Sequence, residues 1–279
     1  MSDWTSGDVD AGGVRLHYHR TGGGGPPLVL LHGFSDSGLC WTRVARELEA
    51  DYDVIMPDAR GHGRSERGGA AFDSARRATD AADLIRGLGL HRVALAGHSM
   101  GAATAAELAA TDPALVACLV LEDPPWRDVQ TAAPGRWDYI RRCQELPLEE
   151  VAAYCRSLAP TWDDAEVGPW VEAKRQFDLS LVETPRPAPP HPWRETAAAI
   201  RCPTLLLTGD TERGAIVTPE AGVEAAHLAR GRVQHIAGAG HNIRREQYQA
   251  YLSAFTGFLH RVYPPVATRA DEASSRGAR

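Results

Sequence analysis

The segment Gly97-His-Ser-Met-Gly101 follows the apolar run Arg92–Gly97 and precedes the Ala-rich stretch Ala102–Ala110. A Gly-x-Ser-x-Gly sequence between a strand and a helix is typical of a very tight turn, which needs small residues at both ends. Such a turn presents the serine hydroxyl at the top of a sheet and at a helix N-terminus. We therefore predict that Ser99 is a nucleophile, because a buried structural serine would not explain the flanking glycines.

A serine hydroxyl is a weak nucleophile at neutral pH and needs a base. The chain has 11 His, and His241 stands out in Gly238-Ala-Gly-His-Asn242, after the last expected strand and before the final expected helix. This position places His241 on a loop at the carboxyl edge of the sheet, where Ser99 is also expected. We predict that His241 is the general base. His98 is the neighbouring alternative, but adjacent residues on a sharp turn diverge, so we expect His98 to pack or hydrogen-bond beneath the turn.

Apolar runs similar to the one before Ser99 recur along the chain and alternate with helix-like segments. The runs, each typical of a strand buried on both faces, are 27–31, 53–57, 92–97, 117–121, 203–208 and 233–236. The helix-like segments are 39–50, 73–88, 100–111, 219–229 and 244–262. This alternation predicts crossover connections and a mainly parallel sheet, an α/β fold. Residues 14–20 alternate in polarity and predict an exposed antiparallel strand.

About eighty residues separate the runs 117–121 and 203–208, which is too many for one crossover helix. The interval contains helix-like pieces near 136–145, 148–158 and 166–181, and a Pro-rich connector at 185–192 that cannot be helical. Five of the seven Trp lie in it: Trp126, Trp137, Trp162, Trp170 and Trp193. We interpret residues 125–196 as a helical cap over a core formed by 1–124 and 197–262, with a flexible tail at 263–279. A second independent domain is disfavoured because the parallel-strand pattern resumes afterwards.

The composition excludes several classes of protein. Hydrophobic residues make up 43% of the chain and the net charge is −6, which is ordinary for a globular protein and unlike a nucleic-acid binder. The 5 Cys form no Cys-x-x-Cys pair, and the first residues lack the pattern of a signal peptide. No apolar run approaches the roughly 20 residues of a membrane span. We expect a cytoplasmic protein that acts on a small molecule, without nucleic-acid or membrane partners.

Several motifs together resemble the α/β-hydrolase superfamily, and the resemblance covers about residues 9 to 262. The matching pieces are Leu31-His-Gly-Phe34, Pro57-Asp-Ala-Arg-Gly-His-Gly-Arg-Ser65, the segment Gly97–Gly101, Leu205-Leu-Leu-Thr-Gly209 and Gly240-His241. The resemblance implies an eight-stranded, mostly parallel sheet flanked by helices, with a helical cap inserted after the sixth strand. It also implies the chain order Ser, acid, His, and an oxyanion hole made by the backbone N–H groups of Phe34 and Met100.

The acid of the triad has more than one candidate. The family usually places it on the loop after the seventh strand, three residues beyond a Gly, which is the position of Glu212 in Thr208-Gly-Asp-Thr-Glu-Arg213. Most members carry Asp there, so Glu212 departs from the pattern, although Glu can also fix the His tautomer. Glu212 is our first choice. Asp210 is the nearest alternative, and the pair Glu122-Asp123 after the sixth strand is another, because some relatives place their acid there.

The resemblance implies a serine hydrolase that cleaves a carboxylic ester or lactone through an acyl-enzyme, with no cofactor and no metal. A C–C bond hydrolase or a cofactor-free perhydrolase of the same fold is the alternative, and a ligand receptor with slow turnover belongs to a different class. The cap Trp residues, Tyr139 and Phe177 indicate an apolar, possibly aromatic substrate, and ordinary cap packing explains them equally well. The sequence leaves open whether the chain forms a homo-oligomer.

Overall fold

The structure is a computed structural model and describes residues 4–67, 72–127, 135–183 and 191–265. Its centre is an eight-stranded sheet with the order β1-β2-β4-β3-β5-β6-β7-β8. The strands are β1 (Thr5–Asp10), β2 (Arg15–Arg20), β3 (Pro27–Leu31), β4 (Asp53–Pro57), β5 (Val93–His98), β6 (Val116–Glu122), β7 (Thr204–Thr208) and β8 (Arg232–His235). Only the pairs β1/β2 and β2/β4 are antiparallel. The sheet is therefore mostly parallel, as predicted.

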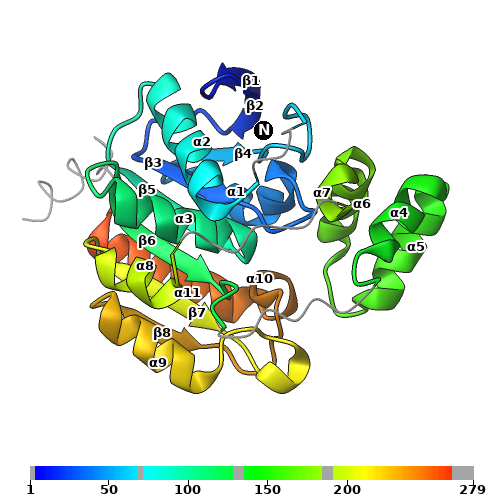
Figure 1. Ribbon diagram of the computed structural model, residues 1–279. Coiled ribbons are helices and arrows are strands. Elements are labelled where there is room, and N and C mark those ends of the chain that lie inside the picture. Colours follow the sequence, from blue (N-terminus) through cyan, green and yellow to red (C-terminus); the bar gives the residue numbers. More distant parts are fainter. Residues whose placement is uncertain (1–3, 68–71, 128–134, 184–190, 266–279) are drawn as a thin grey trace, which may run out of the picture.

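Helices cover both faces of this sheet (Figure 1). The core helices are η1 (Gly38–Trp41), α1 (Thr42–Leu48), α2 (Ser74–Gly87), α3 (Met100–Thr111), α8 (Trp193–Ala199), α9 (Pro219–Leu228), α10 (Ile243–Glu246) and α11 (Tyr248–Val262), with a short η2 (Thr211–Arg213) after β7. Buried residues of α2, α3, α8 and α9 share one apolar cluster with the sheet, and those of α1 and α11 share a second cluster on the opposite face. The five helix-like segments predicted in the core all correspond to helices.

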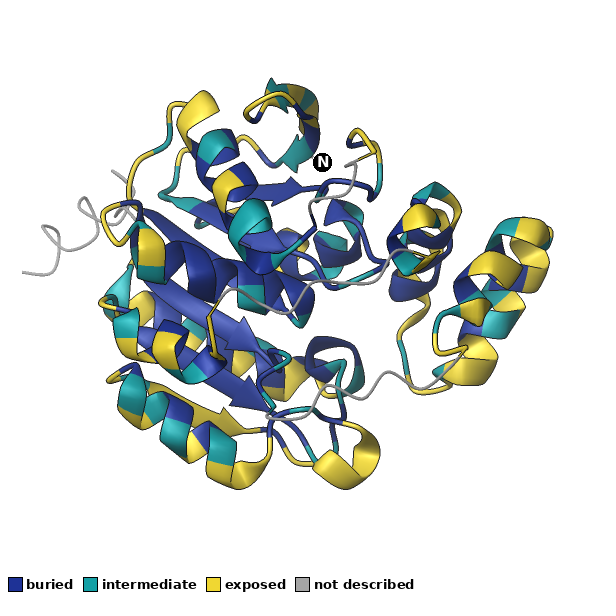
Figure 2. Cartoon of the chain, in the orientation of Figure 1, coloured by how far each residue is buried: buried dark blue, intermediate teal, exposed yellow. Residues whose placement is uncertain are grey.

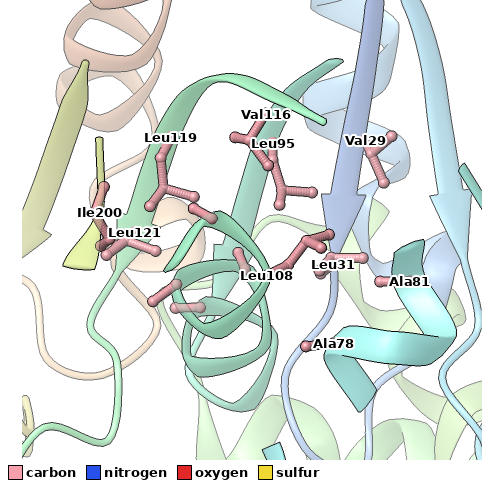
Figure 3. Packing of buried hydrophobic residues seen from close by; sticks show 14 of the residues in the cluster. Val29, Leu31, Ala78, Ala81, Leu95, Leu108, Val116, Leu119, Leu121 and Ile200 are labelled. Carbon is pink, nitrogen blue, oxygen red and sulfur yellow. The ribbon is translucent and has the colours of Figure 1, made fainter. Parts of the chain in front are cut away.

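The central strands divide their side chains between these two clusters. Leu95 of β5 points into the first cluster, and its neighbours Ala94 and Ala96 belong to the second. Leu119 of β6 lies beside Leu95 and packs toward α3, as Figure 3 shows. Figure 2 shows the resulting buried centre between exposed outer helix faces. Full burial of one such leucine stabilises the fold by about 1.5–3 kcal/mol, so the clusters fix the strands on which the site is built.

Among the described residues between β6 and α8, four helices occur, and they lie to one side of the sheet (Figure 1). They are α4 (Asp138–Glu145), α5 (Leu148–Leu158), α6 (Asp164–Gln176) and α7 (Ser180–Glu183). Helices α4, α5 and α6 share a small apolar cluster of their own, and α6 also contacts η1 and α1. We call 138–183 the cap. Helix α8, which includes the last residues of the predicted cap, packs instead on α3 and α9 of the core.

The two ends of the sheet differ from the sequence prediction. The segment 233–236 was predicted as a strand buried on both faces, but β8 is an edge strand and all four of its residues are exposed. A strand at the edge of a sheet has a neighbouring strand on one side only, and α9 covers only part of β8. The apolar residues of this segment therefore do not predict how deeply it is buried. Strand β1 was not predicted, because its polar sequence Thr-Ser-Gly-Asp-Val-Asp carries little strand signal.

Residues 263–265, which the sequence analysis assigns to the tail, belong to the described part of the structure. The Tyr263 hydroxyl donates to the carbonyl oxygens of Pro27 and Arg92, both at 3.3 Å, and its ring stacks with Tyr52. The rest of the predicted tail, 266–279, and most of the Pro-rich connector, at 184–190, lie outside the described residues. No helix in the described part of the chain is long and apolar enough to cross a membrane.

Candidate active site

Ser99 lies between β5 and α3 in a strained backbone conformation, with φ 51° and ψ −113°. Its N–H donates to the Glu122 carbonyl oxygen at 2.9 Å, which ties the turn to the end of β6. The two glycines make this approach possible. A Cβ on Gly97 would lie 2.3 Å from the Gly101 carbonyl oxygen, and a Cβ on Gly101 would lie 2.1 Å from the Leu31 carbonyl oxygen. The turn therefore requires glycine at both positions, and strain of this kind is typical of a functional residue.

The structure places the carboxylate of Asp123 on the imidazole of His241. His241 Nδ1 and Asp123 Oδ2 are 2.6 Å apart, although the residues are 118 positions apart in the chain. The Asp123 side chain is fully buried, and the His241 side chain is 25% exposed. A carboxylate at Nδ1 favours the tautomer in which Nδ1 carries the proton, so the lone pair is on Nε2. This arrangement prepares His241 to accept a proton at Nε2.

Backbone groups from the neighbouring loop fix the Asp123 carboxylate. The Ile216 N–H donates to Oδ1 at 3.1 Å and to Oδ2 at 2.8 Å, and the Val217 N–H donates to Oδ1 at 3.0 Å. Asp123 itself has a positive φ of 41°, directly after the last residue of β6. The loop after β7 thus holds this carboxylate, which belongs to the residue that follows β6. A buried carboxylate with this many donors stays oriented toward the imidazole.

Glu212, the first choice for the acid, does not contact His241; the carboxylate that lies on the imidazole is that of Asp123, one of the alternatives. Glu212 is an exposed residue of η2, and the contact recorded for its carboxylate is with the Thr211 hydroxyl at 3.5 Å. Asp210 accepts from His235 Nε2 at 2.8 Å and from the Gly238 N–H at 2.7 Å. Asp210 therefore braces the loop that leads to His241 and does not contact its ring.

Glu122, the fourth candidate, also has another role. It is buried, and it accepts from the Arg244 N–H at 2.9 Å and from Arg244 Nη1 at 3.3 Å. Burial raises the pKa of Glu122, and Arg244 counteracts that effect. The position after β6 was recognised from the sequence, but nothing in the sequence separated Glu122 from Asp123. The direction of each side chain depends on the positive φ at 123, which sequence reasoning does not supply.

Ser99 and His241 lie at the same edge of the sheet, and no hydrogen bond joins Ser99 Oγ to the His241 ring in the described part of the structure. The ring of His98, the residue before Ser99, lies 4.7 Å from the His241 ring between centroids. In enzymes without substrate, catalytic hydrogen bonds are often long and shorten only in the complex.

Two buried histidines support the loops around Ser99. His98 Nε2 lies 2.9 Å from the His241 carbonyl oxygen, which means that Nε2–H donates to the loop of the predicted base, as expected for a packing role. Burial, together with Arg244, holds the pKa of His98 well below its usual value. His32 donates from Nδ1 to the Gly33 carbonyl oxygen at 2.8 Å and accepts at Nε2 from the Ala59 N–H at 2.9 Å. These contacts fix the loop that carries the Phe34 N–H.

The oxyanion-hole residues predicted from the resemblance lie beside Ser99. Met100 is the first residue of α3, so its N–H is one of the groups at a helix N-terminus that lack a partner within the helix. Gly33 packs against His98 so closely that a Cβ there would lie 2.6 Å from His98 Nδ1. This contact brings the Gly33-Phe34 backbone next to the Ser99 turn. Phe34 and Met100 thus lie next to the Ser99 turn, and their role as oxyanion donors stays a prediction.

A cavity of about 470 Å³ opens at Ser99, and its lining comes from the core, from α8 and from the residues that border the cap in the sequence. Phe34 and Met100 line it, and so do Trp126, Trp137 and Trp193. The other aromatic residues that indicated an apolar substrate pack elsewhere. Tyr139, Trp162 and Trp170 belong to the cap cluster, and Phe177 packs with Phe72 and Met100. The lining of the cavity is thus partly aromatic, and packing within the protein accounts for the other aromatic residues.

A network of buried charged side chains joins the cap to the loops of the site. Lys174 Nζ of α6 lies 3.1 Å from Asp36 Oδ1 and donates to the Ser35 carbonyl oxygen at 2.7 Å. Arg245 bridges Asp36 at 3.1 Å and Glu166 of α6 at 3.0 Å. Burial would raise the pKa of Asp36, but Arg245, Lys174 and Arg244 outweigh it and hold that pKa well below its usual value. Asp36 is therefore charged and fully compensated.

No group of three or more His, Cys, Asp or Glu that could hold a metal ion occurs in the described ranges. The chemistry available at Ser99 is that of a nucleophilic hydroxyl, an oriented imidazole and two backbone donors. That combination suits acyl transfer.

Known proteins share the family and the fold of this chain. Residues 28–254 match the model of the Alpha/beta hydrolase family. N-formylmaleamate deformylase from Pseudomonas putida is 29% identical over 266 residues, covering 91% of this chain and 96% of the deformylase. Lipase LipV from Mycobacterium tuberculosis is 32% identical over 217 residues, covering 75% and 76%. A crystal structure of N-formylmaleamic acid deformylase from Pseudomonas putida is similar with a TM-score of 0.78 and 25% identity, covering 90% of this chain and 100% of that chain. The chain belongs to the alpha/beta hydrolase family and is a hydrolase.

Proposed function

We propose that this hydrolase cleaves a carboxylic ester or lactone through an acyl-enzyme at Ser99. The observation that carries the proposal is the 2.6 Å contact between His241 Nδ1 and Asp123 Oδ2 at the edge where Ser99 opens into the cavity. A buried carboxylate beside Nδ1 would assist catalysis, because it orients the imidazole ring and stabilises the imidazolium that forms during proton transfer.

The proposed reaction begins when His241 Nε2 takes the proton of the Ser99 hydroxyl. Ser99 Oγ forms a bond to the substrate carbonyl carbon, and the negative charge moves to the carbonyl oxygen. The N–H groups of Phe34 and Met100 donate to that oxygen, and a donor of this kind contributes about 2.7–4 kcal/mol to transition-state stabilisation. The tetrahedral intermediate collapses, the bond to the alcohol oxygen breaks, and His241 returns its proton to the alcohol.

The second half of the reaction repeats these steps with water. His241 takes a proton from water, the hydroxyl oxygen bonds to the acyl carbon, and Ser99 leaves with the proton from His241. The products are a carboxylic acid and an alcohol, or a hydroxy acid from a lactone. No cofactor takes part in this scheme, and water is the only co-substrate.

A second candidate is hydrolysis of an N-formyl amide at the same site. It is favoured by the similarity to N-formylmaleamate deformylase, which extends over 91% of this chain. Ester and amide hydrolysis share the acyl-enzyme and the oxyanion, and they differ in the leaving group, which must be protonated more fully when it is an amine. The residues proposed above would take the same roles in either reaction.

The test is a panel of p-nitrophenyl esters, lactones, N-formyl amides and dioxo acids, assayed with the wild-type protein and with Ser99→Ala. We expect turnover of esters or lactones, and a loss on the order of 10⁶ in kcat for Ser99→Ala, as when a serine nucleophile is removed from a triad. Ser157→Ala, an exposed serine of α5, is the matched control and retains full turnover. Near-normal turnover by Ser99→Ala rejects the proposal. Dioxo acids as the best substrates would favour the C–C hydrolase, and acylation without turnover would favour a ligand receptor.

A further inference from the structure

We propose that the cavity at Ser99 selects substrates that carry a carboxylate away from the reacting carbonyl, and that Arg127 and Arg136 bind this carboxylate. The inference deepens the proposed function and rests on it. Both arginines line the same cavity as Ser99. They flank the segment that leads from β6 into the cap, and no sequence motif singled them out.

Arg127 is the first indication that an anion belongs in the cavity. Its Nε is buried and has no hydrogen-bond partner in the described structure. A buried donor without a partner destabilises the folded protein, and more so when the group is charged. Unpaired groups of this kind are rare in folded proteins and commonly mark the place of a ligand, an ion or a water. The guanidinium of Arg127 therefore has donors to offer to a ligand.

Arg136 adds a second positive charge to the first. Its guanidinium packs on the Trp137 ring at 4.7 Å, and burial together with the charge of Arg127 lowers its pKa. Among the residues that the structure describes, no carboxylate acts on Arg136. Two guanidinium groups that repel each other in a partly buried place are each stabilised when an anion lies between them. The geometry thus favours an occupied cavity over an empty one.

The other charged residues of the cavity have partners in the protein. Arg77 donates to the Thr104 hydroxyl at 3.0 Å, and Arg194 pairs with Glu224 at 2.6 Å. On the acidic side, Asp73 caps α2 by accepting from the Arg76 N–H at 2.7 Å. The second carboxylate of the lining, Glu107, accepts from the Thr196 hydroxyl at 3.2 Å. Neither carboxylate neutralises Arg127 or Arg136, although the whole chain carries a net charge of −6.

The chemistry of guanidinium groups indicates a carboxylate as the ligand. Arginine presents N–H donors in a planar fork that matches the two oxygens of a carboxylate. The lining of the cavity also includes the aromatic residues Trp137, Phe34 and Trp126, which suit a short apolar linker between the carboxylate and the carbonyl. A cavity of about 470 Å³ holds a small molecule of this kind. The substrate class is a monoester, lactone or amide that bears a free carboxylate.

The test compares pairs of esters that differ in one carboxylate. The first pair is 4-nitrophenyl hemiglutarate and 4-nitrophenyl valerate, with the carboxylate on the acyl side. The second is 3-(butyryloxy)benzoate and phenyl butyrate, with the carboxylate on the alcohol side. The wild-type protein should favour the anionic member of at least one pair by tenfold or more in kcat/KM, and added salt should reduce that ratio because it screens charges. Equal kcat/KM in both pairs overturns the inference.

Substitutions then assign the preference to residues. Arg127→Gln and Arg136→Gln each should lower the anionic-to-neutral ratio about tenfold to hundredfold, the range of one charge-assisted hydrogen bond. Arg127→Lys should retain part of the preference for the anionic ester, because lysine keeps the positive charge but lacks the planar pair of N–H donors. Arg156→Gln, an exposed arginine of α5, is the control and should leave the ratio unchanged. A ratio that persists when both Arg127 and Arg136 are replaced by Gln also overturns the inference.

The outcomes separate this inference from the proposed function. If neutral esters are hydrolysed through Ser99 without any preference for the anionic members, the proposed function stands and the carboxylate site does not. If none of the four esters is hydrolysed, glutarate binding measured by calorimetry tests the site by itself. Binding that disappears in Arg127→Gln supports the site while the proposed function fails, and absence of binding contradicts both.

Discussion

The catalytic edge and the cap are held in place by different kinds of contact. At the catalytic edge, backbone N–H groups of Ile216 and Val217 hold Asp123, and close backbone contacts at Gly97 and Gly101 hold the Ser99 turn. The cap helix α6 is joined to the core instead by buried ion pairs of Lys174 and Glu166. Backbone contacts follow from the arrangement of the strands, whereas each ion pair depends on two particular side chains.

This difference separates the effects expected from substitutions. At the edge, a side chain that touches the reacting groups can be replaced with little loss of stability, because the backbone still holds the loop. In the cap, removal of one charge leaves its partner buried without full compensation, so stability falls first. The following predictions test that separation.

The largest effect is expected on turnover from Asp123→Asn. An amide at this position can still accept from the Ile216 and Val217 N–H groups, but it favours the wrong tautomer of His241 and does not stabilise the imidazolium. We expect kcat to fall by about 10⁴ with little change in the free energy of unfolding. The measurement is kcat on the best ester of the panel, together with urea unfolding.

Glu212→Gln is the matched control for that substitution. Its carboxylate is exposed and does not contact His241, so kcat should stay within about twofold of the wild-type value. A large loss of kcat in Glu212→Gln, together with full activity in Asp123→Asn, would contradict the prediction. It would indicate that Glu212, the first choice from the sequence, is the acid of the triad.

The next effect is on stability, from Lys174→Met. The Lys174 side chain is 1% exposed, and its replacement leaves Asp36 with only Arg244 and Arg245. Loss of one member of a buried ion pair costs about 3–5 kcal/mol, and we expect the lower end because two partners remain. Urea unfolding gives the free energy directly. A change below about 1 kcal/mol would show that the network does not hold the cap.

The third effect is on the pH dependence of stability, and it concerns His62. Burial holds the pKa of His62 well below its usual value, so the folded protein leaves it neutral where the unfolded chain protonates it. Stability therefore falls as the pH falls below about 6.5, by at most about 1.4 kcal/mol per pH unit from this residue. The free energy of unfolding of His62→Gln, measured from pH 5 to 8, should show a smaller slope than that of the wild type. Parallel curves would contradict the prediction.

The smallest effect is expected from Arg156→Ala in α5. Arg156 pairs with Asp164 at 3.0 Å, but the two side chains are 56% and 82% exposed. An exposed pair of this kind contributes roughly 0–1 kcal/mol, because water screens the charges. Urea unfolding should place this variant close to the wild type. A loss as large as that of Lys174→Met would show that exposure does not distinguish the ion pairs of this protein.

The core was predictable because its signals are local. The runs of apolar residues predicted the parallel strands, and Gly97-His-Ser-Met-Gly101 predicted the tight turn. Both features are determined by residues that are close together in the sequence. The edge strands were less predictable, because burial of β8 depends on what packs on it. Of the three side chains assigned to the proposed triad, the sequence identified Ser99 and His241 and left the acid among four residues.

The remaining features of the site depend on contacts between residues far apart in the chain. The positive φ at Asp123 and the N–H groups of Ile216 and Val217, 93 and 94 residues later, decide which carboxylate reaches His241. Arg127 and Arg136 have no motif around them, and their importance is visible only from the cavity that they share with Ser99. Such pairings are set by the fold as a whole, so one sequence does not display them.

Covalent labelling tests the central claim most directly. The protein is treated with a fluorophosphonate, and the labelled residue and the labelling rate are determined by mass spectrometry. The account predicts one adduct on Ser99, formed at the same rate in the wild type and in Glu212→Gln, and formed much more slowly in Asp123→Asn and in His241→Ala. An adduct on another residue, or labelling of Ser99 that is as fast without His241 as with it, would contradict the account.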